Sequence, residues 1–254
     1  MKGVGLRRGV LAAVGLLLLC AAAARAGGSG APGPAEAPPV EVRTRGTALF
    51  YAGPITPEGV ARARALLEAS PQVRELVVHS GGGDVVAGMD LGDLVHARGL
   101  DVRVSGGLCM SSCANYVFTA GRRKTIEPGS LVVWHGSMLQ EGLLEQFDPA
   151  AVTHHTGRRL TWWERRMAMR AVRRDYERVL RRQNAFYARI GVDGTITVIG
   201  QRMGCGCQWT LAVEDMAAFG VRDVSAPDDY AQPGYGADDF PWELLRLGGD
   251  AARG

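Results

Sequence analysis

Apolar residues after residue 40 fall into short runs, separated by segments in which they recur at helical spacing. The short runs are compact and largely β-branched or aromatic, which favours buried strands. They lie at 48–51, 76–78, 102–104 and 130–134. Between them, apolar steps of three and four residues predict helices that begin near Pro57, Val85 and Ser112, the last ending near Ala120. Strands alternating with helices predict right-handed βαβ units, hence an α/β fold with a mainly parallel core sheet.

A longer amphipathic pattern runs from Thr161 to about Ile190. A helix of this length exceeds what a small core needs, so we expect it to cover the domain's own face or to join subunits of a homo-oligomer. Arginine dominates residues 158–182, although the net charge of the chain is only +3. We interpret this stripe as a solvated or subunit-facing surface and expect no nucleic-acid partner.

The N-terminal 26 residues have the order of parts found in a secretory signal peptide. A basic start is followed by an apolar run and by a small-x-small ending at Ala24-Arg25-Ala26, which predicts cleavage before Gly27. The protein is therefore expected to be periplasmic or secreted. The alternative is an uncleaved N-terminal membrane anchor, although the apolar run is shorter than a typical span.

The remaining chain has the composition of one domain with two less regular ends. Residues 27–39 are rich in Gly, Ala and Pro and predict a flexible linker. Residues 40–224 are enough for a single core but too few for two domains. Residues 225–254 contain recurring Asp, Pro and Gly, so we expect a loosely ordered tail apart from an apolar patch near Phe240 and Trp242.

Four cysteines remain after removal of the signal segment, in a compartment that permits disulfides. They are Cys109, Cys113, Cys205 and Cys207. Three pairings are open. A zinc site is the alternative, but a C-x3-C pair with a distant C-x-C is not a usual ligand spacing, and no metal or other cofactor is predicted.

Candidate chemistry lies where three predicted strands end, the edge at which α/β sheets usually carry their sites. The first exit is a glycine turn at 81–83, whose backbone N–H groups can approach a developing oxyanion. The second leads into a helix at Ser112, with Ser111 as the neighbouring alternative nucleophile. The third carries His135, which can act as a general base for such a serine.

These segments resemble the Clp protease proteolytic subunit and its exported relatives, within the Clp/crotonase-type folds. The family pattern Ser-x-Gly-Gly-x-Val-x-x-Gly-Met matches residues 80–89. The family's serine, nine residues before the glycine of an Ala-Gly pair, matches Ser112 and Gly121, and its histidine after an apolar strand matches His135. The resemblance covers about residues 48–224 in pieces, with the 161–190 helix at the place of the family's protruding handle helix.

The resemblance implies roles for four residues. Ser112 is the expected nucleophile, His135 the expected base, and the N–H groups of Gly82 and Cys113 the expected oxyanion hole. Cys109 and Cys113 flank the nucleophile at a spacing that permits a disulfide fixing this turn. Cys113 itself is an alternative nucleophile.

The third member of the family's catalytic triad departs from the pattern. Neutral Gln208 stands where the family has an aspartate that orients the histidine. The chain would then have a Ser-His dyad, or Asp193 or Asp215 would supply the acid. A serine-lysine mechanism would need Lys124, which lies close to Ser112 in sequence.

The sequence therefore predicts an exported serine hydrolase, a peptidase acting on peptides or proteins, without an ATP-driven unfoldase because those partners work in the cytosol. A catalytically silent binding or scaffold protein of the same fold is the main alternative, favoured by Gln208. A crotonase-like enzyme acting on an acyl-CoA thioester is a third, and fold alone does not separate it from the first.

Overall fold

The computed structural model describes residues 39–146, 161–205, 208–232, 235 and 241–248. The predicted signal peptide and nearly all of the predicted linker lie outside these residues. Among the helices that are described, none is both long and apolar enough to cross a membrane.

The described elements follow one another as the alternating pattern predicts, with additional short pieces near the C-terminus. In chain order they are β1 Glu41–Arg45, β2 Ala48–Ala52, α2 Pro57–Ala69, β3 Glu75–Ser80, α3 Val85–Arg98, β4 Asp101–Met110, the π-helix η1 Cys113–Phe118, β5 Lys124–Ile126, β6 Leu131–Val133, α5 Trp162–Ile190, the 3-10 helix η2 Gly194–Thr197, α6 Ile199–Arg202, β7 Trp209–Leu211, α7 Val213–Met216, the 3-10 helix η3 Ala217–Phe219, β8 Val224–Ser225 and β9 Glu243–Leu245.

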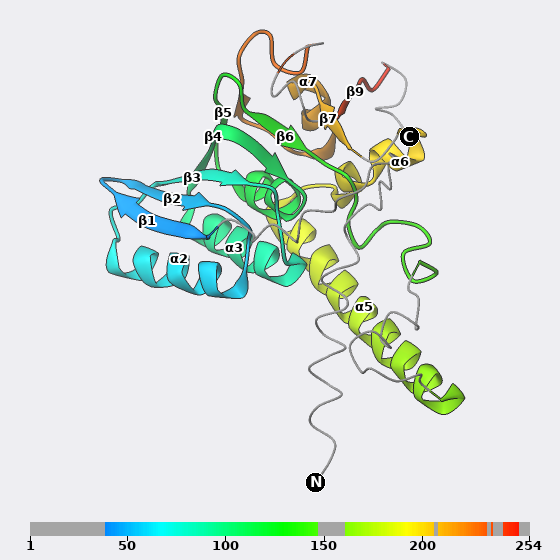
Figure 1. The fold of residues 1–254 in the computed structure, drawn as a ribbon. Helices are drawn as coiled ribbons and strands as arrows, with labels where there is room; N and C mark the ends of the chain where they lie inside the picture. Colours follow the sequence, from blue (N-terminus) through cyan, green and yellow to red (C-terminus); the bar gives the residue numbers. More distant parts are fainter. Residues whose placement is uncertain (1–38, 147–160, 206–207, 233–234, 236–240, 249–254) are drawn as a thin grey trace, which may run out of the picture.

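The main sheet of the described chain has the order β1-β2-β3-β4-β5-β8, with β6 also paired to β4 (Figure 1). Every pair in it is parallel except β1 with β2. The predicted α/β fold with a mainly parallel sheet is therefore confirmed. Strand β1 was not predicted, because Val42 is its one strongly apolar residue. It forms an edge hairpin with β2 across Gly46, whose φ of 59° suits glycine.

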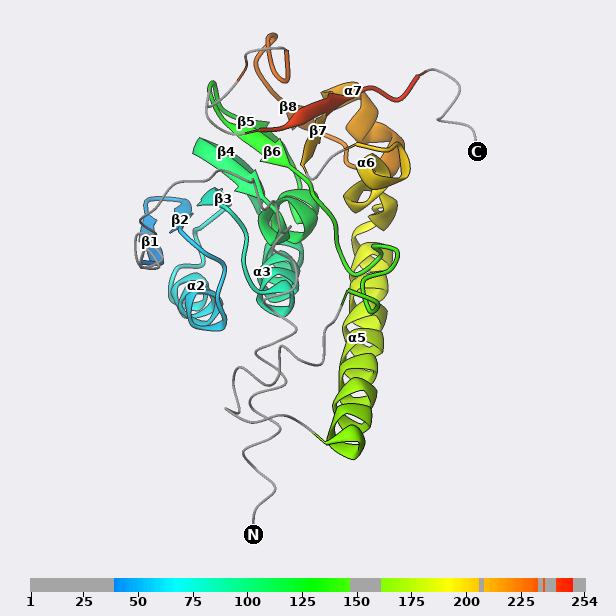
Figure 2. The ribbon, with the colours of Figure 1, turned by 45° about the vertical axis from the view of Figure 1, so that its right-hand side comes forward.

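Helices α2 and α3 lie together against one face of the sheet (Figures 1 and 2). The Thr56 side chain accepts a hydrogen bond from the N–H of Gly59 at 3.0 Å, and Pro57 occupies the first turn of α2. Asp84 caps α3 in the same way, accepting from the N–H of Ala87 at 2.7 Å. These caps fix where each helix begins, directly after the strand end that precedes it.

Strand β4 is longer than predicted, because the Gly106-Gly107 pair bends it without ending it. Both glycines have positive φ, 76° and 136°. Residues 102–104 pair with β5, and residues 108–110 pair with β6. The bend lets one strand serve two neighbours, and it brings the end of β6 beside the end of β4.

The predicted long helix is confirmed as α5. Its N-terminal part extends away from the rest of the domain (Figure 2). Its C-terminal half is tied to the body: Arg182 forms a 2.6 Å ion pair with Asp90 of α3, and the Tyr116 hydroxyl donates to buried Gln183 at 2.7 Å. Whether its outer half meets a second subunit stays a prediction.

The folded part extends beyond Val224 into the segment expected to be loosely ordered. Strand β8 adds to the main sheet, and β9 pairs in parallel with β7. Tyr230 is buried and its hydroxyl lies 3.0 Å from that of Thr210. In the described part of this Asp/Pro/Gly-rich stretch, aromatic side chains are buried against the core. Phe240 lies outside the described residues.

Candidate active site

The three predicted strand exits meet at one edge of the sheet. Ser80 at the end of β3 is paired with Cys109 of β4, and Met110 at the end of β4 is paired with Val133 at the end of β6. Because these strands are parallel, the segments that follow them leave the sheet on the same side. The glycine turn (81–83), the serine turn (111–112) and the histidine turn (135–136) are therefore neighbours.

The glycine turn is held by its own backbone and by Ser80. The N–H of Ile55 donates to Gly82 O at 2.8 Å, and the N–H of Asp84 donates to Ile55 O at 2.9 Å. Gly82 has a φ of 94°, a conformation that favours glycine. Its N–H already donates to Ser80 Oγ at 3.1 Å, so in this conformation it does not face an open site as an oxyanion donor.

The Ser112 side chain lies inside the protein. Its hydroxyl donates to Gly83 O at 2.9 Å, and the residue is only 1% exposed. A Cβ at Gly88 of α3 would lie 2.8 Å from Ser112 Cβ, so helix α3 packs directly on this side chain. Ser112 thus ties the serine turn to the glycine turn, and no hydrogen bond joins it to His135 in the described structure.

Ser111 occupies the sharp turn between β4 and the helix. Its φ of 58° is in the left-handed region, which non-glycine residues seldom adopt. The backbone is held on both sides: Ser111 N–H donates to Val133 O at 3.2 Å, and Ser111 O accepts from the N–H of Asn115 at 2.7 Å. The residue is 8% exposed, and its hydroxyl has no hydrogen bond to any described residue.

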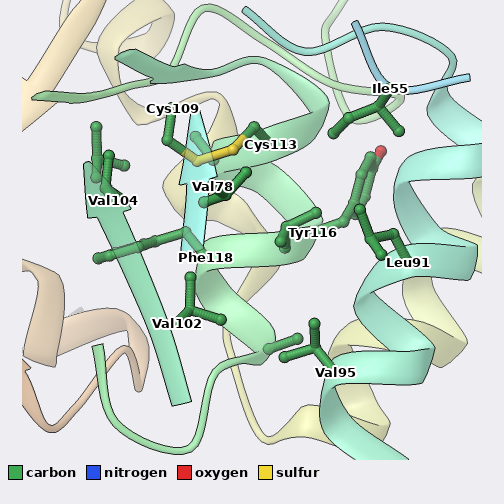
Figure 3. Packing of buried hydrophobic residues seen from close by; sticks show 14 of the residues in the cluster. Ile55, Val78, Leu91, Val95, Val102, Val104, Cys109, Cys113, Tyr116 and Phe118 are labelled. Carbon is green, nitrogen blue, oxygen red and sulfur yellow. A yellow bond between two sulfur atoms is a disulfide. The ribbon is translucent and has the colours of Figure 1, made fainter. Parts of the chain in front are cut away.

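Cys109 and Cys113 form a disulfide that bridges the serine turn (Figure 3). Their Cα atoms are 5.2 Å apart and both residues are fully buried. The expected disulfide is therefore confirmed. A Cys113 thiolate nucleophile and a zinc site using these two cysteines are excluded in this oxidised form. The N–H of Cys113 lies in the first turn of η1, where N–H groups lack partners within a regular helix.

His135 directly follows β6 and the Trp134 bridge to β7. It is 8% exposed, and burial lowers the pKa of its imidazole below the usual 6.5, opposed by a hydrogen bond to its own backbone. Its carbonyl accepts from Gln201 Nε2 at 3.2 Å, while the next carbonyl, of Gly136, accepts from Asn115 Nδ2 at 2.9 Å. Asn115 thus connects the serine helix to the histidine turn.

Gln208 is the cross-strand neighbour of His135. Trp134 and Trp209 form an antiparallel bridge with both N–H···O bonds at 2.8 Å, which places the preceding Gln208 opposite the following His135. The Gln208 Oε1 atom is buried and has no hydrogen-bond partner among the described residues. Gln208 and His135 therefore adjoin this bridge on its two strands, and no hydrogen bond joins their side chains in the described structure.

The two alternative acids have other partners. The Asp193 carboxylate accepts from the N–H of Thr195 at 2.9 Å and caps η2. The Asp215 carboxylate accepts from the N–H of Leu247 at 3.3 Å. No contact in the described structure brings either carboxylate to His135.

Lys124 lies at the far end of the sheet from the serine turn. It pairs with Val102 near the start of β4, whereas Ser111 and Ser112 follow the end of that strand. Its Nζ atom donates to Arg222 O at 3.0 Å, and burial lowers its pKa to about 8. A serine-lysine mechanism through Lys124 does not fit this placement.

A cavity of about 290 Å³ adjoins the histidine turn. Gln201, which donates to the His135 carbonyl, and Gln140, whose Oε1 would lie 2.6 Å from a Cβ at Gly136, both line it. Glu141 and Arg202 add a charge of each sign to the lining. The cavity combines these side chains with apolar Leu139 and Val198, and it was not apparent from the sequence.

No protein-family model and no curated protein sequence matches the chain. Similar solved structures include a methylmalonyl CoA decarboxylase complexed with 2S-carboxypropyl CoA, at 11% identity and a TM-score of 0.29, with 37% of this chain covering 48% of that chain. A membrane-bound stomatin-specific protease matches at 15% identity and a TM-score of 0.30, over 50% of this chain and 69% of that chain.

A probable enoyl-CoA hydratase from Mycobacterium tuberculosis matches at 12% identity and a TM-score of 0.32, over 66% of this chain and 96% of that chain. The chain thus spans about half the length of the decarboxylase and nearly all of this hydratase. The matches include a protease and CoA-ester enzymes, the two kinds of protein considered from the sequence. At these TM-scores they assign neither a fold nor a reaction on their own.

Proposed function

We propose that this chain is a serine hydrolase, a peptidase that works by acyl transfer at the Ser111-Ser112 turn with His135 as general base. The observation that carries the proposal is the meeting of three strand exits at one edge of the sheet, joined by the β4–β6 register and by the Asn115–Gly136 hydrogen bond. A nucleophile, a base and N–H groups at a helix start are the parts that acyl transfer needs.

The substrate we propose is a peptide or protein, because the cavity that adjoins the histidine turn offers apolar, hydrogen-bonding and charged side chains to an extended chain. We also propose that the protein is exported to the periplasm or secreted. The Cys109–Cys113 disulfide supports export, since disulfides persist in oxidising compartments and are rare in the cytosol.

Labelling with a fluorophosphonate probe tests the hydrolase proposal. We expect the folded protein from Gly27 onward to be labelled, and His135→Ala to slow labelling by about 10²- to 10⁴-fold, the usual contribution of a general base. Because burial holds the His135 pKa below 6.5, the neutral base form persists into mildly acidic solution. The rate of wild-type labelling should therefore be half-maximal below pH 6.5.

The competing proposal is a catalytically silent binding protein, favoured by the neutral Gln208. In that case a folded, disulfide-bonded sample would give no covalent adduct at any pH between 5 and 9. Such a result would overturn the hydrolase proposal, and capture of a peptide ligand in the cavity would then become the relevant activity.

Gln208 is proposed to orient His135 as a neutral hydrogen-bond acceptor in place of the family's aspartate. What supports this role is that the buried Gln208 Oε1 has no hydrogen-bond partner among the described residues and that Gln208 and His135 flank the Trp134–Trp209 bridge. Replacing it with the similarly sized Gln208→Leu should slow labelling by about tenfold to hundredfold, because the base loses its orienting partner. Circular dichroism spectra should be unchanged.

Gln208→Glu distinguishes orientation from packing. A carboxylate opposite His135 would favour the imidazolium, raise the His135 pKa and move the acid limb of the labelling profile to higher pH. An unshifted limb in Gln208→Glu, together with full activity in Gln208→Leu, would show that Gln208 has no part in positioning the base.

A further inference from the structure

The motif spacing selected Ser112, but the structure gives the two adjacent serines different surroundings. The Ser112 hydroxyl is bonded to Gly83 O, and its side chain is covered by α3. The Ser111 hydroxyl has no hydrogen bond to a described residue, and the residue is 8% exposed against 1% for Ser112. The Ser112 hydroxyl is therefore engaged in a hydrogen bond, whereas the Ser111 hydroxyl is not.

The local backbone bears on the residue count by which the motif selects Ser112. Ser112 lies nine residues before Gly121, as the motif requires, whereas Ser111 lies ten before it. That count assumes a regular α-helix between the two points. Residues Cys113–Phe118 are instead π-helical, and a π-helical turn inserts one residue relative to an α-turn. Because of the inserted residue, Ser111, ten residues before Gly121, takes the position that a serine nine residues before the glycine would have in a regular α-helix.

The geometry around Gly82 points to the same residue. A Cβ at Gly82 would lie 2.5 Å from Ser111 Cβ and 3.0 Å from the backbone nitrogen of Ser112. Gly82 therefore lies against the Ser111 side chain and the Ser112 backbone more closely than any residue with a Cβ could. A helix-start N–H that follows a nucleophile is a suitable donor to the oxyanion formed at that nucleophile.

From these observations we propose that Ser111 is the nucleophile and that the Ser112 side chain has a structural role. The left-handed turn presents the Ser111 hydroxyl at the strand-to-helix junction, and the disulfide and the Ser112–Gly83 hydrogen bond hold that turn. This assignment rests on the proposed hydrolase function and names the atom at which it acts.

The reaction at Ser111 balances without any further reactant. Ser111 Oγ forms a bond to the substrate carbonyl carbon as its proton passes to His135, and the bond to the leaving group breaks as that group takes the proton. Water then releases the acyl group by the same steps and restores the serine. With a fluorophosphonate, the new bond is from Oγ to phosphorus, and fluoride leaves.

The test is to locate the adduct on the wild-type protein. After labelling, reduction and trypsin digestion, fragment-ion mass spectrometry separates Ser111 from Ser112 within the peptide 104–122. We expect the adduct on Ser111. An adduct on Ser112 would overturn the assignment and keep the hydrolase, whereas a folded protein without any adduct would overturn both.

Matched variants provide a second readout. Ser111→Gly removes the hydroxyl while suiting the left-handed backbone, so it should abolish labelling by more than about 10³-fold without loss of structure. Ser112→Ala removes only the hydrogen bond to Gly83 O and should retain labelling within about tenfold, with a modestly lower Tm. Retained labelling in Ser111→Gly and its loss in a folded Ser112→Ala would contradict the assignment.

Discussion

Gly82→Ala is expected to abolish fluorophosphonate labelling and to lower the free energy of unfolding by about 2–5 kcal/mol. The added Cβ would lie 2.5 Å from Ser111 Cβ and 2.7 Å from Met110 O, and the φ of 94° is unfavourable for alanine. Because one contact is with backbone, a rotamer change cannot relieve it. Urea denaturation and labelling kinetics on the same samples measure the two effects.

Gly81→Ala is the matched control for this substitution. It adds the same methyl group one residue earlier, where no heavy atom would lie within 4 Å and φ is not positive. Its stability should change by less than about 1 kcal/mol, with labelling preserved. Equal behaviour of the two variants would mean that the close approach of Gly82 to the serine turn is not what the site depends on.

The strand exits were predictable because their signals are local. A β-branched run followed by glycines, or an apolar run ending at His135, identifies both the strand and the residue that leaves it. Parallel pairing then requires the exits to share one edge. For this reason the sequence alone predicts that the Ser80, serine-turn and His135 segments lie close together, although they are far apart in the chain.

The features that the sequence concealed depend on backbone geometry or on long-range pairing. A π-helical insertion leaves no compositional signal in Cys113–Phe118, so the register of the nucleophile was predicted from spacing alone. The apolar run predicted a strand only at 102–104, yet Gly106 and Gly107, with their positive φ values, bend a strand that continues to Met110. The facing of His135 and Gln208 depends on a β-bridge between Trp134 and Trp209, residues 75 positions apart.

The C-terminal segment after Val224 also depends on contacts that its own sequence does not reveal. Its Asp, Pro and Gly content predicted loose order, but Tyr230 packs edge-on against Tyr235 at 5.4 Å and bonds to Thr210. A few aromatic side chains that find a hydrogen-bonded, buried place can outweigh a composition typical of loops. The tyrosines themselves can be read from the sequence, but the residues they pack against and bond to cannot.

Lys124→Met is expected to raise the free energy of unfolding at pH 7 by up to about 3 kcal/mol, even though it removes a hydrogen bond to Arg222 O. Lys124 is 5% exposed, and burial lowers its pKa from 10.5 to about 8, opposed by nearby Asp223. At pH 7 the amine is charged in both states, so the folded protein bears the full cost of burying that charge.

The sign of the pH dependence follows from where each state loses its proton. Between pH 8 and 10.5 the unfolded chain keeps a proton that the folded chain has released, so the stability of the wild type rises with pH. The advantage of Lys124→Met should therefore shrink from about 3 to about 1 kcal/mol between pH 7 and 9.5. The control is Arg123→Met, which removes an adjacent cation that is largely exposed. Its difference from the wild type in free energy of unfolding should be the same at both pH values. Urea denaturation of the three proteins at both pH values measures this, and a constant gap for Lys124→Met would mean that Lys124 keeps its charge on folding across that range.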